Sequence, residues 1–154
     1  MATNPQPVGV SAAGVPGARC VDHVALTVPD LDVAIGFVVN ALGGALVYRL
    51  PPLARDDDWM ERHLDVHPRA VAEIALMRLG PTTNLELFEY GAPDHNAAPP
   101  RPDDVGSTHL GLFVDDVDTA AKTLQVRDGL RALGPARTVP AGSPDAGTRW
   151  VRQS

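Results

Sequence analysis

The sequence of 154 residues contains little of what would place it in several common protein classes. Cys20 is its one cysteine, so an intrachain disulfide and a zinc site built from several cysteines are both excluded. No apolar run approaches the ~18 residues that a transmembrane helix needs. The first 20 residues lack the basic start and strong apolar stretch of a signal peptide. We therefore expect a cytoplasmic protein without a membrane partner.

Basic and aromatic residues are also scarce. Lys and Arg together number 13 against 19 Asp and Glu, which gives a formal net charge of −6, and the basic residues form no cluster. Nucleic acid is therefore not an expected partner. Aromatic residues make up only 5% of the chain, which argues against a protein that works solely by stacking an aromatic ligand. The 44% of hydrophobic residues is ordinary for a globular protein.

Two segments of the sequence match each other without gaps. Residues 23–34, HVALTVPDLDVA, align with residues 109–120, HLGLFVDDVDTA, and six of the twelve positions are identical. Valine, leucine and alanine are common here and carry little weight. A histidine and two aspartates in register are harder to obtain by chance. We interpret the match as an internal duplication.

Each copy predicts a strand, a tight turn and a helix. Apolar residues alternate with other residues from His23 and again from His109, which is the period of a strand. Asp30 and Asp116 then follow as natural N-caps. The first helix is expected to end at Gly43-Gly44 and the second near Leu133. Further strands are predicted at Ala45–Arg49, Glu73–Leu79, Asn84–Tyr90, Arg137–Val139 and Thr148–Arg152, with a hairpin turn at residues 80–83.

These elements predict a chain of two related α+β units. Residues 1–20 form a flexible N-terminal tail, 21–90 a first βαβββ module, 91–106 a proline-rich linker, and 107–154 a second module that lacks its last strand by comparison with the first. Segment 50–72 fits neither helix nor strand period and is interpreted as an insertion. We expect the two sheets to curve around a common interior and the insertion to cover its mouth, with Trp59 as the buried anchor.

Strand phase indicates which side chains can meet. His23, Glu86 and His109 fall on the sheet faces that their neighbouring helices do not cover. Two imidazoles and a carboxylate are a common ligand set for a divalent transition metal. The alternatives are a hydrogen-bonded histidine at a strand start and a solvent-facing carboxylate. His63 and His67 have the i,i+4 spacing of a helical metal pair, but Pro68 follows directly, which favours cap or surface roles.

The segments DHVALTVPDLDVAIGF, NLELFEY and STHLGLFVDDVDTAA resemble the vicinal oxygen chelate superfamily, which includes glyoxalase I, methylmalonyl-CoA epimerase, extradiol dioxygenases and bleomycin-sequestering proteins. The resemblance implies paired βαβββ modules that form a cupped, barrel-like mixed sheet around one divalent metal ion: Zn, Ni, Co, Mn or Fe. Carried over to this sequence, the ligands are His23, Glu86 and His109. A fourth ligand, on the last strand of the second module, would lie beyond Ser154.

The resemblance further implies a metal-dependent enzyme of the glyoxalase or epimerase type, an isomerase or lyase. The metal would polarise substrate oxygens while a carboxylate moves a proton, with Glu86 as a possible base. The alternatives are an extradiol-type dioxygenase and a non-catalytic antibiotic-binding resistance protein. A small-molecule substrate is expected to contact Thr27, Trp59, Phe88 and Phe113. A homodimer is expected as well, and members of the family build the cup either within one chain or across a dimer.

Overall fold

The computed structural model describes residues 15–127 and 130–152, so most of the expected N-terminal tail lies outside the described residues. The chain divides into two compact units. One comprises residues 19–107, and the other comprises the described residues from 108 onward together with 15–18. The fold class is α+β with a mixed sheet, as the sequence predicts.

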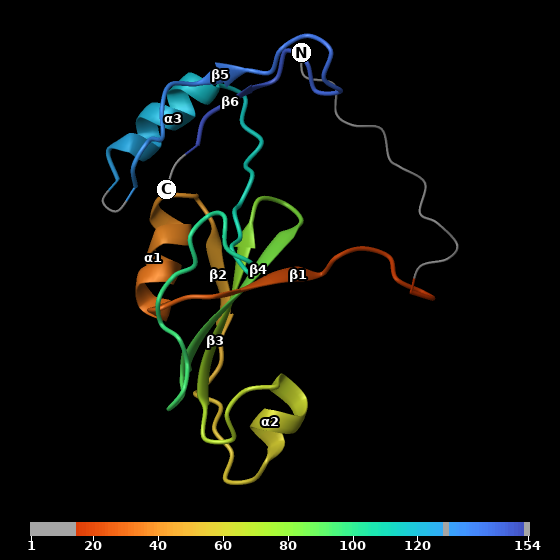
Figure 1. Cartoon of the computed structure of the whole chain (residues 1–154), viewed down its shortest axis with the longest axis vertical. Helices are drawn as coiled ribbons and strands as arrows, with labels where there is room; N and C mark the ends of the chain where they lie inside the picture. The colour runs from red at the N-terminus through yellow and green to blue at the C-terminus, as the bar shows by residue number, and fades with distance from the viewer. Residues whose placement is uncertain (1–14, 128–129, 153–154) are drawn as a thin grey trace. The chain divides into compact units, whose positions relative to one another are not determined.

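The unit of residues 19–107 is a βαβββ module with a short helix inserted. Its elements are β1 (His23–Thr27), α1 (Leu31–Asn40), β2 (Ala45–Arg49), α2 (Trp59–Leu64), β3 (Val71–Leu79) and β4 (Thr83–Gly91). The strands lie in the order β1-β4-β3-β2 (Figure 1). β1 runs parallel to β4, while β3 is antiparallel to both β4 and β2.

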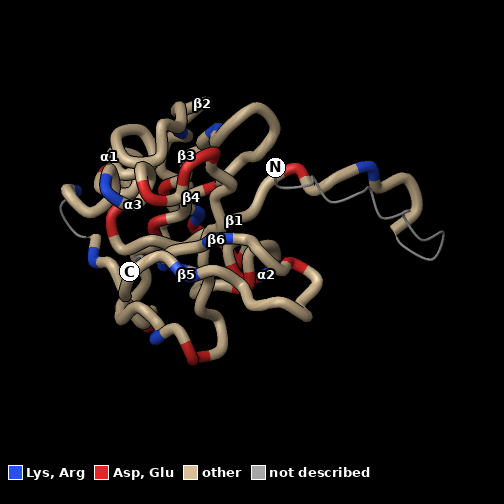
Figure 2. The backbone as a smooth tube through the Cα atoms, turned by 90° about the horizontal axis from the view of Figure 1, so that it is seen from above, with Lys and Arg blue, Asp and Glu red and all other residues tan. Residues whose placement is uncertain are grey.

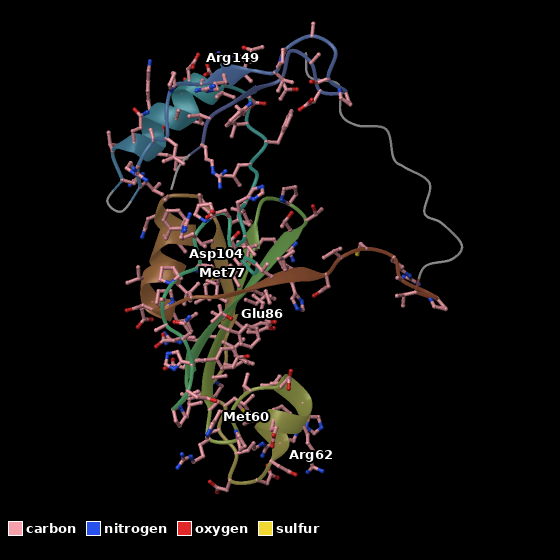
Figure 3. All side chains as sticks on the ribbon, viewed as in Figure 1. Met60, Arg62, Met77, Glu86, Asp104 and Arg149 are labelled. Atoms are coloured by element: carbon pink, nitrogen blue, oxygen red, sulfur yellow. The ribbon has the colours of Figure 1, made fainter. Side chains whose placement is uncertain are left out.

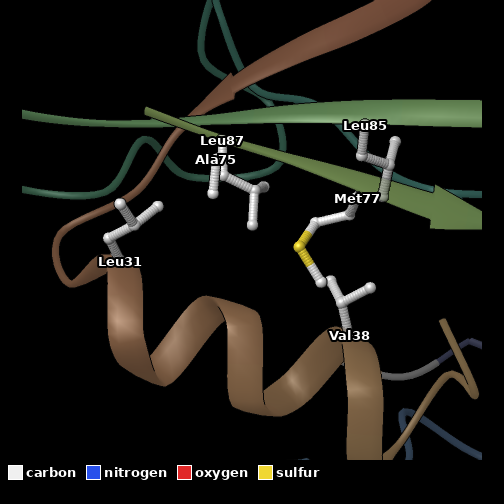
Figure 4. Close-up of a cluster of buried hydrophobic side chains, with 6 residues drawn as sticks. All are labelled: Leu31, Val38, Ala75, Met77, Leu85 and Leu87. Atoms are coloured by element: carbon white, nitrogen blue, oxygen red, sulfur yellow. The ribbon is translucent and has the colours of Figure 1, made fainter. Parts of the chain in front are cut away.

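The main core lies between the sheet and α1. Alternate residues of β3 and β4 point to the same face, where they meet a stripe along the helix. Leu31 and Val38, two turns apart on α1, contact this face (Figure 4). The buried members of the cluster are Leu31, Val38, Ala75, Met77, Leu85 and Leu87.

Two carboxylates satisfy the N-terminal amides of α1. Asp30 caps the helix as predicted, since its side chain accepts a hydrogen bond from the amide of Val33 at 2.8 Å. Glu89, on the helix-facing side of β4, accepts a second bond from the amide of Leu31 at 2.7 Å. A negative charge at a helix N-terminus also interacts favourably with the helix dipole. Glu89 therefore ties the helix to the sheet.

Glu89→Gln is expected to lower the free energy of unfolding by about 1 kcal/mol, because the amide can still accept a hydrogen bond but no longer carries the charge that favours the helix terminus. Denaturant unfolding measures this effect. Asp94→Ala, a change to an exposed carboxylate after β4, serves as the control and should stay within about 0.5 kcal/mol. Equal stability of the two variants would contradict the capping role.

The other face of the same sheet carries a second apolar cluster that includes α2. Its buried residues are Met60, Ala70, Ala72 and Ile74, and Phe88 and Tyr90 pack against them. The insertion therefore lies on the sheet face opposite α1. Met60 is fully buried, whereas Trp59 is only partly buried. The prediction that Trp59 is the buried anchor is wrong, because the smaller methionine occupies that place.

The other unit contains α3 (Val117–Gln125) and the two-residue strands β5 (Arg137–Thr138) and β6 (Arg149–Trp150), which pair antiparallel. Asp116 caps α3 through the amide of Thr119 at 2.9 Å, as predicted. The helix ends at Gln125, well before the predicted end near Leu133. The strand predicted at residues 109–114 is also absent: in the described part of the chain this segment has no regular structure and no ladder partner.

The aspartates shared by the two copies have matching structural roles. Asp30 and Asp116 are N-caps. The second aspartate of each copy forms an ion pair with an arginine of a following strand. Asp32 contacts Arg49 at 2.6 Å, and Asp118 contacts Arg149 through two bonds of 2.7 and 2.9 Å. Capping and helix–strand pairing therefore account for two of the identities in the internal repeat.

The described residues contain no helix both long and apolar enough to cross a membrane. Lys and Arg positions are interspersed with Asp and Glu positions along the backbone (Figure 2), in agreement with the lack of a basic cluster in the sequence.

Candidate active site

The pairing of β1 with β4 brings His23 and Glu86 together. His23 lies opposite Asn84 in the register, and Ala25 lies opposite Glu86. Because side chains two residues apart share a face, the side chains of both His23 and Glu86 project from the face opposite α1. Nε2 of His23 lies 3.3 Å from Oε2 of Glu86. Figure 3 shows Glu86 on the sheet, above the level of Met60.

The other ring nitrogen of His23 also faces a carboxylate. Nδ1 lies 2.9 Å from Oδ2 of Asp22, which places the imidazole between two acids. The hydrogen bond with Asp22 raises the pKa of His23 above its ordinary value. Loss of solvent partly opposes this shift, and the charges of Glu86 and Asp22 reinforce it. When the ring is protonated, it can donate to Asp22 and form an ion pair with Glu86.

Asp22→Asn is therefore expected to lower the pKa of His23, which an NMR titration of the ring measures. Because the folded pKa is raised, the stabilisation by Asp22 is fully present below about pH 6.5, the ordinary histidine value. It is lost as the pH rises through the higher folded pKa. Wild type and variant should thus differ most in stability at mildly acid pH and converge in alkali. An unchanged His23 pKa in the variant would contradict the assignment.

A divalent metal fits the chemistry of the donors around His23. Nε2 of His23 and Oε2 of Glu86 lie 3.3 Å apart, so either a proton on the ring or a metal ion between the two atoms would satisfy both of them. Two donors bound to one ion at about 2.1 Å are separated by about 3.0 Å at a right angle and about 3.4 Å at a tetrahedral angle. The observed 3.3 Å lies within that range.

His23 also has the support that metal-binding histidines commonly show, a carboxylate on the nitrogen that does not face the metal. Within the residues that the structure describes, no group of three or more His, Cys, Asp or Glu side chains is close enough to hold an ion. The module of residues 19–107 thus supplies a pair of donors, and a full ligand set needs a further group. The prediction that His109 is that group remains untested, because it belongs to the other unit.

Asn84 is a polar residue of this face that the sequence did not mark as functional. Its side-chain nitrogen donates to the backbone carbonyl of Asp22 at 3.1 Å. Its oxygen Oδ1 is buried and has no hydrogen-bond partner among the described residues. The alternation of β4 places Asn84 on the face of Glu86, and that phase was the one signal in the sequence that could have pointed to it.

Aromatic residues continue the same face along β4. The rings of Phe88 and Tyr90 stack with centroids 5.5 Å apart and an interplanar angle of 4°. Burial raises the pKa of Tyr90, and the charge of Glu86 raises it further. Thr27 is the register partner of Phe88 and is exposed. Thr27 and Phe88, both predicted to contact a substrate, thus lie on the face that carries His23 and Glu86.

The other residues that the sequence suggested as metal ligands or substrate contacts make different contacts in the structure. Trp59 stacks on His63 with ring centroids 4.7 Å apart, and the Arg55 guanidinium lies 5.6 Å from its ring centroid. His63 and His67 make local contacts, to the carbonyl of Trp59 and the amide of Arg69, respectively. Because α2 ends at Leu64, this histidine pair does not share a helix. Phe113 is 83% exposed in the irregular segment of the other unit.

Comparison with known proteins places the chain in a family. The family model described as the Glyoxalase/Bleomycin resistance protein/Dioxygenase superfamily matches residues 21–135. A curated relative, 2-epi-5-epi-valiolone epimerase from Actinomyces sp, is 51% identical over 142 residues, which are 92% of this chain and 76% of the relative.

A solved structure, that of a glyoxalase family protein from Bacillus cereus, superposes with a TM-score of 0.63 at 21% identity. The match covers 82% of this chain and 85% of that one, and at this identity it supports the fold alone. The chain belongs to the Glyoxalase/Bleomycin resistance protein/Dioxygenase superfamily, as its sequence resemblance implied.

Proposed function

We propose that this chain is a divalent-metal-dependent epimerase of a small ketone. His23, Glu86 and His109 would hold the ion, whose identity among Zn, Ni, Co, Mn and Fe is open. The observation that carries the proposal is the 3.3 Å approach of His23 Nε2 to Glu86 Oε2, with Asp22 behind the ring. The relative that is 51% identical and named an epimerase favours an isomerase over a lyase, a dioxygenase or an antibiotic-binding protein.

Epimerisation next to a carbonyl requires that a C–H proton leave one face of the carbon and that a proton, here from solvent water, return to the other face. A bound divalent ion supplies Lewis-acid stabilisation of the negative oxygen that this deprotonation produces. Asp22 holds the ring of His23 so that Nε2 faces the site. Glu86 directs one carboxylate oxygen toward His23, and its second oxygen is the candidate proton acceptor.

The remaining residues of this face can bind the substrate. Phe88 and Tyr90 offer apolar ring surface beside Glu86, which would exclude water from the carbon that loses its proton. Thr27 offers an exposed hydroxyl next to Phe88. The homodimer and the cytoplasmic location stay predictions.

The direct test of the reaction is proton exchange in deuterated water. Protein loaded with a divalent metal is incubated with 2-epi-5-epi-valiolone, and proton NMR follows the signals next to the carbonyl. We expect these signals to exchange for deuterium while a second epimer appears. Both processes should stop after dialysis against a chelator and resume when metal returns. Exchange at the full rate in verified metal-free protein would overturn the metal requirement, and stable substrate signals with metal bound would overturn the reaction.

A further inference from the structure

A chain of hydrogen bonds connects Asn84 to the proposed metal ligand. The amide nitrogen of Asn84 donates to the carbonyl of Asp22 at 3.1 Å, across the β1–β4 pair. The carboxylate of Asp22 in turn lies 2.9 Å from Nδ1 of His23. The side chain of Asn84 therefore holds the backbone from which Asp22 and His23 both project, just before β1 begins.

The oxygen of the same side-chain amide makes no hydrogen bond to the described residues. This atom, Oδ1 of Asn84, is also buried. Such an acceptor destabilises a fold, because it has lost water and gained nothing in return. A leucine has a similar size and would avoid this cost. What an asparagine adds here and a leucine cannot is the hydrogen bond to the carbonyl of Asp22.

We infer that Asn84 is a positioning residue of the active site. Its N–H group holds the carbonyl of Asp22 and, through Asp22, orients the ring of His23. Asn84 and Glu86 are two residues apart on β4 and project from one face, so a ligand held at Glu86 lies on the side to which Asn84 belongs. The inference rests on the proposed function, since it assigns Asn84 to that same site.

The positioning role is tested first without metal. At alkaline pH, nitrogen chemical shifts show which ring nitrogen of neutral His23 carries the proton. In the wild type we expect it on Nδ1, where Asp22 accepts it. In Asn84→Leu this preference should weaken, while the melting temperature stays equal or rises. Asn84→Ala provides a second variant. An unchanged tautomer in both variants, or loss of folding in both, would contradict the inference.

Titration with Co²⁺ completes the test. Asn84→Leu should bind Co²⁺ about 10- to 100-fold more weakly, the range for partners that support a metal ligand. Wild-type Co²⁺ affinity in the variant would overturn the inference alone. If the wild type itself bound no Co²⁺, the proposed function would fail, and the tautomer measurement would still decide the positioning role.

Discussion

Glu86→Gln is expected to reduce divalent-metal affinity by more than about 100-fold, beyond the usual effect of a residue that only supports a ligand. The substitution keeps the shape of the side chain but removes the negative charge that faces Nε2 of His23 at 3.3 Å. A neutral amide is a poorer ligand for a divalent transition metal than a carboxylate. The metal affinity is measured by titration with Co²⁺, in which the absorption spectrum of the ion reports binding. Turnover of the ketone should fall together with the affinity.

Glu89→Gln is the matched control for Glu86→Gln. Both residues belong to β4, but Glu89 faces α1 and bonds the amide of Leu31, whereas Glu86 projects from the other face. The two variants should show opposite patterns: Glu86→Gln loses metal and retains stability, whereas Glu89→Gln retains metal and loses stability. Equal metal affinity in both variants would contradict the assignment of Glu86 as a ligand.

Met77→Ala is expected to lower the free energy of unfolding by about 2–5 kcal/mol, the usual cost of truncating a buried methionine. Met77 is fully buried between the sheet and α1, beside Val38 (Figure 4). The loss has two sources, the apolar contacts of the side chain and the cavity that remains. Denaturant unfolding, with the slope checked for two-state behaviour, measures it.

Leu46→Ala is the control for the core. Leu46 is the register partner of Met77 on β2, yet it is 46% exposed. Its truncation should cost about 1 kcal/mol or less, because much of its surface already contacts water. If the two truncations cost the same, the packing of β3 against α1 would not be the main source of stability in this module.

The helix and strands of the first module could be predicted because local sequence patterns indicate them. Alternation of apolar residues indicates β1 and β4, and an aspartate before an apolar stripe indicates α1. The segment at residues 109–114 has the same alternation as β1 but forms no strand. β1 has β4 beside it, and among the described residues nothing pairs with 109–114. Pairing depends on distant residues, which a local pattern does not contain.

The candidate site could be predicted only in part. Strand phase indicates that His23 and Glu86 share a face, and the structure brings them into contact. The phase does not indicate Asp22, because neighbours along an extended chain ordinarily point in opposite directions. Asp22 precedes the first residue of β1, and its side chain reaches back to the ring of its neighbour. Segment 50–72 lacks periodicity, so nothing local distinguished Met60 from Trp59 as the buried residue.

The metal content of the purified protein tests the central claim most directly. The chain is produced without added metal, and elemental analysis is performed on the wild type and on Glu86→Gln after identical washing. We predict about one equivalent of a divalent transition metal per wild-type chain, the expected stoichiometry of a single site, and far less in the variant. Wild-type protein that contains no such metal, takes up none on titration and still epimerises the ketone at full rate would contradict the claim.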